Sequence, residues 1–553
     1  MARMGEGALL LLGAGTMQIP AMEAAKRIGL TLWVVDANPE APGVPLADHF
    51  EAIDLRDPES IIRLARSIPH LRAVFTAGTD FSLSVARVAE ALGLPGVPRE
   101  VALDASRKSS MRRRFAEAGV SSPAFAVIRG GGPLEEQVSR AVASVGVPAV
   151  AKPADNMGAR GVRRVARADE AMVAVESAMA WARGGEVVYE EWIEGREFSI
   201  DALVYRGEIT ITGIADRHIY FDPYFIEMGH TIPALLEREE EELLLETFRA
   251  GVRALGIDNG AAKGDVFIRE EGGAVVGEIA ARLSGGYMSG WTYPLATGVE
   301  LTEAGIRLAL GEDPRTLLIP KRHHTTAERA FISIPGTLRE IEGADALTAR
   351  TSVRELFLRV APADALAPPR NNTEKCGNLI VTGVTRLEAC REAAEALRSL
   401  TVRLEPSRGE TDSYLFSRRG EVSWYHYPEL LPLPVPAARL REKELRAWAR
   451  RCRNSGLLLL DPAVVEAAPR ARVDRRDRQL GAGHHWSGFT REEAVQSLLS
   501  RGVAAVESLE ESAVSLLLRV LAIGGNQGLL YIRDTLMKKG EAAVERWMEE
   551  MRG

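Results

Sequence analysis

Two carboxylates in the middle of the chain are spaced for binding a divalent cation. Over residues 263–282, two strand-like runs flank a polar, glycine-bearing turn, a pattern that predicts a β-hairpin. With the turn centred between positions 271 and 272, Asp265 lies directly opposite Glu278. Like charges in register repel unless a cation lies between them, and two carboxylates with phosphate oxygens suit Mg²⁺. The alternative is two carboxylates splayed on a solvated face. The residues predicted to share this face are Lys263, Asp265, Phe267, Val276, Glu278, Ala280 and Arg282.

A lysine that precedes a glycine-rich loop is the second chemical signal. Lys152 follows the apolar run at residues 147–151 and introduces a loop that contains Gly158 and Gly161. Glycines let main-chain N–H groups approach an anion closely, so such a loop can cradle phosphates. Because the lysine comes first and on a strand, this is not the GxxxxGK[ST] phosphate loop. By itself the pattern fits a plain β-hairpin turn equally well.

The third signal is a strand that stops at a short bend. Glu190 and Glu191 end the first strand, Ile193 lies in the bend, and Glu197 follows on the next strand. A strand that breaks off leaves main-chain groups unpaired, and these can hydrogen-bond the edge of an adenine. In isolation, ordinary surface carboxylates are the better explanation of this segment.

The N-terminal region alternates strand and helix patterns, which predicts an open parallel sheet. The expected strands cover residues 8–12, 32–35 and 73–76, and the expected helices cover 21–28, 61–66 and 82–91. Gly13 and Gly15 in the first turn, with Asp36 after the second strand, make up most of a dinucleotide-binding fingerprint. The third glycine is missing. Both a bound nicotinamide cofactor and a plain α/β domain with turn glycines therefore stay open.

The whole chain is predicted to be α/β and α+β, with several domains. The N-terminal open parallel-sheet domain is followed by a nucleotide-binding core of two subdomains, an α+β C-terminal lobe and an extra, mainly helical region. Lys and Arg exceed Asp and Glu over residues 439–478, which indicates either a solvated face or a docking surface for an acidic partner. The predicted boundaries are 1–105 for the N-terminal domain, 106–320 for the core with a mobile lid at about 115–190, 321–420 for the lobe, 421–438 for a proline-rich linker and 439–553 for the helical region.

The amino-acid composition is typical of a globular protein. The 553 residues are 46% hydrophobic and 26% charged, which is enough apolar material for buried cores. The net charge of −7 does not favour a nucleic-acid partner. The three cysteines, Cys376, Cys390 and Cys452, are too widely spaced for a disulfide framework. With no export signal and no membrane-spanning run in sight, we expect a cytoplasmic protein.

In this order and spacing, the three segments resemble the ATP-grasp superfamily of ATP-dependent carboxylate–amine or carboxylate–thiol ligases. The resemblance covers roughly residues 8–404, and the run after Arg282 is most similar to the L-amino acid ligase and carbamoyl-phosphate-synthetase-like branch. It implies that residues 1–105 form a substrate-binding domain and that ATP and Mg²⁺, or Mn²⁺ in its place, are the cofactors. The implied site comprises Lys108, Lys152, Gly158, Gly161, Glu190, Glu191, Ile193 and Glu197 for ATP; Asp265 and Glu278 for the metal; Lys263 and Arg282 for catalysis; and Glu227, His230, Gly285 and Gly286 for substrate.

Two positions depart from the family pattern. The usual Glu-x-Asn-x-Arg is Glu278-x-Ala280-x-Arg282, and the loop serine is Ala159. The resemblance nevertheless implies amide formation through an acyl phosphate, with release of ADP and phosphate, from small carboxylate and amine substrates. A homo-oligomer is also expected, and a membrane partner is not. The alternatives are a nucleotide-binding docking or sensing protein without turnover and an NAD(P)-dependent oxidoreductase.

Overall fold

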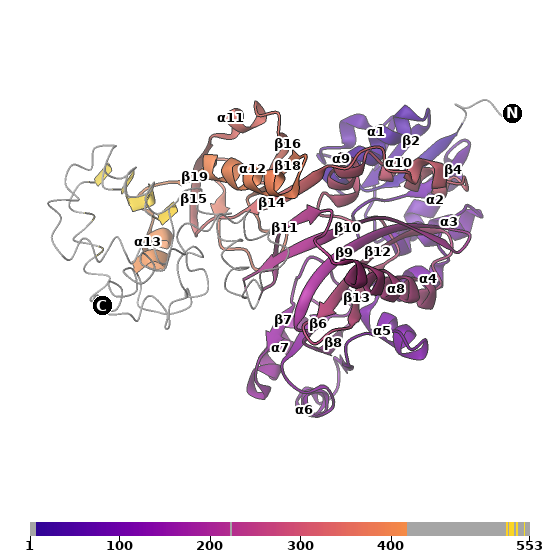
Figure 1. The fold of residues 1–553 in the computed structure, drawn as a ribbon, viewed down its shortest axis with the longest axis horizontal. Coiled ribbons are helices and arrows are strands. Elements are labelled where there is room, and N and C mark those ends of the chain that lie inside the picture. The colour runs from indigo at the N-terminus through magenta and orange to yellow at the C-terminus, as the bar shows by residue number, and fades with distance from the viewer. Residues whose placement is uncertain are drawn as a thin grey trace. The chain divides into compact units, whose positions relative to one another are not determined.

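The computed structural model describes residues 7–221, 224–416 and separate positions between 527 and 547. It divides into two compact units (Figure 1). Unit 1 comprises residues 1–217 and 231–324, and unit 2 comprises residues 218–230 and 325–553. For the residues described, the α/β and α+β class predicted from the sequence is confirmed.

Unit 1 begins with the predicted parallel sheet, whose strand order is β3-β2-β1-β4. β1 is apolar along its whole length and fully buried, as expected for a central parallel strand with helices on both faces. β3 was not predicted because it is short and mostly exposed. The strands are β1 (Ala8–Leu12), β2 (Thr31–Asp36), β3 (His49–Ala52) and β4 (Leu71–Phe75), and the helices are η1 (Thr16–Gln18), α1 (Ile19–Arg27), η2 (Val44–Leu46), α2 (Pro58–Ser67), α3 (Ser82–Leu92) and α4 (Arg99–Ser106).

The second part of unit 1 is an antiparallel sheet with the order β5-β8-β6-β7. Its own small core lies between this sheet and two helices, so it can fold as a subdomain. It covers most of the segment predicted as a lid. The strands are β5 (Phe125–Arg129), β6 (Ala149–Pro153), β7 (Arg163–Val165) and β8 (Glu186–Glu191), and the helices are α6 (Leu134–Val145), η3 (Ala168–Glu170) and α7 (Ala171–Met179).

The third part of unit 1 carries the hairpin predicted from the two carboxylates. Its strands lie in the order β13-β12-β9-β10, and α8 packs on β12 and β13, as Figure 1 shows. α8 starts with a capping box between Glu237 and Glu240 and ends at Gly256, whose φ of 77° suits glycine. The elements are α5 (Lys108–Glu117), β9 (Gly195–Tyr205), β10 (Glu208–Tyr220), α8 (Arg238–Leu255), β12 (Gly260–Arg269), β13 (Ala274–Ala280), η4 (Met288–Thr292), α9 (Tyr293–Thr297), α10 (Leu301–Ala309) and η5 (Arg315–Leu318).

Unit 2 contains both strands and helices. The chain passes into it within β10 and leaves it again within β11. Its strands lie in the orders β11-β14-β18-β16 and β17-β15-β19, and α12 packs on β14 and β18. The elements are β11 (Ile226–Ile232), β14 (Thr325–Phe331), β15 (Gly336–Glu342), α11 (Ala344–Thr348), β16 (Val353–Leu358), β17 (Ala365–Leu366), β18 (Gly377–Gly383), α12 (Arg386–Ser399), β19 (Thr401–Leu404) and α13 (Gly409–Phe416).

The described positions between 527 and 547 are helical and belong to the core of unit 2. Trp547 is fully buried, stacks on Phe416 and donates its Nε1–H to Asp412 at 2.9 Å. Asp534 and Arg403 form a buried ion pair of 2.5 Å. The prediction that residues 439–553 form a separate helical region is corrected at this end, because these side chains complete the core of the lobe. The predicted linker at 421–438 and the predicted docking surface at 439–478 lie outside the described residues.

Replacing the buried Trp547 is expected to destabilise unit 2. Trp547→Ala deletes a fully buried indole and the hydrogen bond to Asp412, so we expect a loss of about 3–5 kcal/mol in the free energy of unfolding. Denaturant unfolding of the full chain measures this loss. Lys539→Ala, at an exposed position of the same segment, is the matched control. Equal stability of the two variants would contradict the packing of this segment.

Candidate active site

The predicted pairing of the two carboxylates is confirmed. Asp265 is the direct partner of Glu278 in the β12–β13 ladder, and Lys263 is the partner of Ala280. Beyond Asp265 the register shifts by one residue, so Val266 pairs with Val276. The extra residue is Gly277.

This bulge corrects the predicted face. Val276 had been placed with the carboxylates, but it is buried with Val266 in the core beneath α8. Gly277 allows the bulge because a Cβ atom there would lie 2.6 Å from the ring of Phe267.

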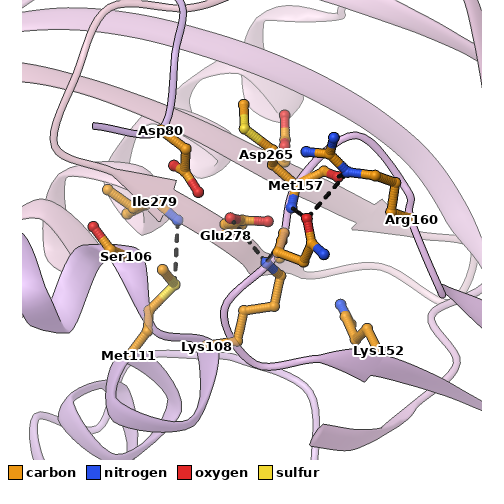
Figure 2. Close-up of polar contacts among 12 residues, drawn as sticks. Asp80, Ser106, Lys108, Met111, Lys152, Met157, Arg160, Asp265, Glu278 and Ile279 are labelled. Carbon is orange, nitrogen blue, oxygen red and sulfur yellow. Dashed lines mark hydrogen bonds and ion pairs between the residues drawn. The ribbon is translucent and has the colours of Figure 1, made fainter. Parts of the chain in front are cut away.

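Lysines surround the carboxylate pair. Lys263 Nζ lies 2.5 Å from Asp265 Oδ2. Lys108 Nζ lies 3.4 Å from Glu278 Oε1 (Figure 2). Desolvation raises the pKa of Glu278, but nearby positive charges outweigh it and bring the pKa to about 2. In decreasing order of effect these charges are Lys108, Lys263, Lys152 and Arg282. Glu278 is therefore a carboxylate at all physiological pH values.

Arg217 on β10 is a site residue that the sequence did not reveal. Its Nη1 lies 2.9 Å from Asp265 Oδ1 and 2.5 Å from Glu197 Oε1. It thus links Asp265, the predicted metal ligand, to Glu197, a predicted ATP-binding residue. The signal in the sequence was a charged residue within a long, partly buried strand. The sequence did not show on which face of β10 the side chain of Arg217 would lie.

The loop after Lys152 is held in a defined shape. Gly158 and Gly161 have φ values of 68° and 73°, and Ala159 lies in the same left-handed region at 59°. Asn156 anchors the loop: its main-chain oxygen accepts a hydrogen bond from Lys108 Nζ at 2.8 Å, and its side chain donates to the main chain of residue 181. Lys108, which holds the loop through Asn156, also contacts Glu278 (Figure 2). The predicted phosphate loop and metal carboxylates are therefore neighbours.

The bend predicted to bind the adenine edge follows β8 (Glu186–Glu191). Glu190, buried to 1% exposure, pairs with Lys152 at 2.6 Å, and Glu191 forms a two-pronged ion pair with Arg269 at 2.8 and 3.2 Å. Ile193 is also buried, and among the described residues its main-chain N–H has no hydrogen-bond acceptor. An adenine edge would satisfy it.

Asp80 is a second site residue missed from the sequence. It lies in the loop after β4, and its Oδ1 is 3.7 Å from Nε of Arg282. Ligands of open α/β sheets bind at the carboxyl ends of the strands, which was the available signal. Gly285 explains the approach of the two segments, because a Cβ atom there would lie 2.9 Å from the carbonyl oxygen of Gly78. Gly286 has a φ of 60° in the same turn.

The four predicted substrate residues divide between the units, because Glu227 and His230 belong to unit 2. His230 is buried between two carboxylates, with Nδ1 3.0 Å from Glu328 and Nε2 3.4 Å from Glu227. Burial lowers the pKa of His230, but the two glutamates outweigh it and raise the pKa to about 9. The side chain is thus an imidazolium at neutral pH. Glu328 was not predicted.

The first turn of the N-terminal sheet does not favour a dinucleotide. Asp36, the residue expected to bind a ribose, accepts the N–H of Ala14 at 2.8 Å and that of Asn38 at 2.9 Å. Both of its oxygens are therefore used locally. Gln18 is fully buried beside Gly13 and hydrogen-bonds both main-chain groups of Ala77.

The residues present fit ATP with Mg²⁺. Among the described residues, no group of three or more metal-ligating side chains occurs. A cation between Asp265 and Glu278 would therefore take its other ligands from phosphate and water oxygens, as Mg²⁺ commonly does. The surrounding lysines and arginines match the charge of a triphosphate.

Comparison with known families agrees with this geometry. An ATP-grasp domain model matches residues 145–290, and a model of the L-amino acid ligase C-terminal domain 2 matches residues 330–405. Residues 145–290 of the chain are therefore an ATP-grasp domain. The chain is an ATP-grasp ligase, a class whose members use ATP and Mg²⁺ and whose general chemistry is ATP-dependent carbon–nitrogen ligation.

Individual relatives are distant. The uncharacterised protein y4rH of Sinorhizobium fredii is 26% identical over 396 residues, which are 70% of this chain and 80% of that protein. Carnosine synthase 1 of Gallus gallus is 27% identical over 341 residues, 57% of this chain. The chain spans only 36–42% of the length of the carnosine synthases it matches. The L-amino acid ligase of Bacillus licheniformis has the same fold, with a TM-score of 0.63 and 22% identity over 72% of this chain and 99% of that one.

Proposed function

We propose that this ATP-grasp ligase joins the carboxylate of one small molecule to the amine of another through an acyl phosphate. The observation that carries the proposal is the pair Asp265 and Glu278, opposed in register and surrounded by cations. A carboxylate does not react with an amine directly because its oxygen is a poor leaving group. Phosphorylation by ATP supplies a good one.

The reaction has two balanced steps. An oxygen of the substrate carboxylate attacks the γ-phosphorus of ATP, and ADP leaves. The amine nitrogen then attacks the acyl carbon, phosphate leaves with the carboxylate oxygen, and the nitrogen gives up a proton. Magnesium-bound ATP brings the phosphoryl group that is transferred.

The chain's own residues would hold the reactants and neutralise the developing charge. We assign the triphosphate to Lys108 and Lys152 with the main chain of residues 156–161, and the adenine edge to the bend at Ile193. Lys263 and Arg282 flank the carboxylate pair and would stabilise the transferring phosphoryl group. Asp80, which lies beside Arg282, would hold the ammonium form of the amine substrate and accept its proton.

We propose amino acids as the substrate class. The support is the match of residues 330–405 to the L-amino acid ligase C-terminal domain 2. His230 pairs with Glu328, which comes two residues before this region, and with Glu227. These two carboxylates and the imidazolium would bind a charged group of the amino acid. Their role in substrate binding is part of the proposal.

A pairwise screen tests the proposed function. The purified full chain is incubated with ATP, MgCl₂ and pairs drawn from the amino acids and small carboxylic acids, and ADP, phosphate and product mass are measured. We expect equal amounts of ADP, phosphate and a product lighter than the pair by one water, only when both partners are present. Nucleotide binding without turnover in every pair would instead support a sensing or docking protein.

A further inference from the structure

One arginine beneath the nucleotide site is bonded to two other elements of the site. Arg112 lies on α5 four residues after Lys108, and its side chain is fully buried. Its Nε and Nη2 lie 3.0 and 3.1 Å from the two carboxylate oxygens of Glu190 on β8. Nη2 also donates to the carbonyl of Gly277, the bulge residue of β13, at 2.5 Å. Because it is buried, Arg112 cannot touch the nucleotide itself.

Glu190 has two cationic partners that differ in their freedom to move. Arg112 is enclosed and held by two-pronged bonds, whereas the Lys152 side chain is 19% exposed and has a single contact of 2.6 Å with Glu190. Burial raises the pKa of Glu190, but the charges of Arg112 and then of Lys152 outweigh it and keep the pKa below its ordinary value. Glu190 therefore stays ionised inside the protein.

We propose that Arg112 is a positioning residue that neutralises Glu190 permanently, so that Lys152 can turn from Glu190 to an ATP phosphate. The inference rests on the proposed role of Lys152 in phosphate binding. If Lys152 were the only cation beside Glu190, its departure would strand a buried carboxylate without a partner, which is strongly unfavourable. A guanidinium suits this role because it is always charged and grips a carboxylate with two parallel bonds.

A positioning role and a merely structural role of Arg112 predict different losses of ligand binding. Without Arg112, Lys152 stays paired with Glu190 and is not available to bind the triphosphate. The bend at Ile193, which would bind the adenine edge, is unchanged. Arg112→Gln should therefore weaken the binding of a triphosphate and spare the binding of adenosine. A merely structural role would weaken both.

The experiment compares two probes on the full chain by calorimetry. For Arg112→Gln we expect about 10-fold weaker binding of a non-hydrolysable ATP analogue with Mg²⁺, and adenosine affinity within about twofold of the wild type. Arg112→Lys should recover part of the loss because it restores the charge. Arg113→Gln, which changes the exposed neighbour whose guanidinium donates to Ser110 Oγ, is the matched control and should bind both probes normally.

A double variant tests the proposal even if Arg112→Gln alone fails to fold. In Arg112→Gln with Glu190→Gln, no buried carboxylate holds Lys152, so ATP-analogue binding should be within about threefold of Glu190→Gln alone. A further loss in the double variant, an equal loss of both probes in the single variant, or unchanged binding of the analogue would each overturn the proposal. If the wild type itself does not bind the analogue, the proposed function fails instead.

Discussion

Glu278→Gln is expected to lower ATP turnover on the order of 10³-fold while leaving the fold intact. The substitution keeps the shape of the side chain but removes the charge, and with it one of the two carboxylates that would face the metal. Glu278 is 39% exposed at its side chain, so the change strands nothing in the core. Phosphate release at increasing Mg²⁺ concentrations measures the loss.

The control for this variant lies on the same hairpin. Glu270→Gln changes an exposed glutamate near the turn and should leave turnover within about twofold of the wild type. Raising Mg²⁺ should recover little activity in Glu278→Gln, because the charge itself is missing. Normal turnover in Glu278→Gln would refute the assignment of the metal site.

The second large effect is expected for Lys152→Met, which should bind an ATP analogue about 10- to 100-fold more weakly than the wild type. The protein should still fold, because Glu190 keeps its two-pronged bond to Arg112 after the lysine is removed. Calorimetry with a non-hydrolysable analogue and thermal unfolding measure the two quantities.

Lys321→Met is the matched control for this variant. Lys321 is an exposed lysine of the same unit, and its loss should change neither quantity. Unchanged nucleotide affinity in Lys152→Met would remove the phosphate role from Lys152. The inference about Arg112 would fall with it.

The sequence predicted those parts of the site that depend on local periodicity. Counting along the hairpin placed Asp265 opposite Glu278, although the pairs nearer the turn, such as Phe267 with Val275, lie one residue out of the predicted register. The same count misplaced Val276, because a single bulge residue, Gly277, shifts the register and leaves no signal beyond the glycine itself.

Contacts between segments that are distant in the chain could not be predicted from the sequence. Arg217 meets Glu197 and Asp265 only because β10 and β12 flank β9 on either side, and the strand order is not written in any one motif. The same holds for Asp80, which comes to Arg282 from a loop some two hundred positions earlier in the chain. The place of Trp547 in the core of unit 2 was missed, because the proline-rich stretch suggested a domain boundary before it. A residue beyond such a boundary was not expected to pack into the preceding lobe.

The most direct test of the central claim follows the oxygen that the acyl phosphate would carry. The acid of the pair with the highest turnover in the screen is labelled with ¹⁸O in its carboxylate, and the products are examined by mass spectrometry and ³¹P NMR. The account predicts ADP and inorganic phosphate that contains one oxygen from the acid. Release of pyrophosphate with the label in AMP, or phosphate without label, would contradict an acyl-phosphate ligase.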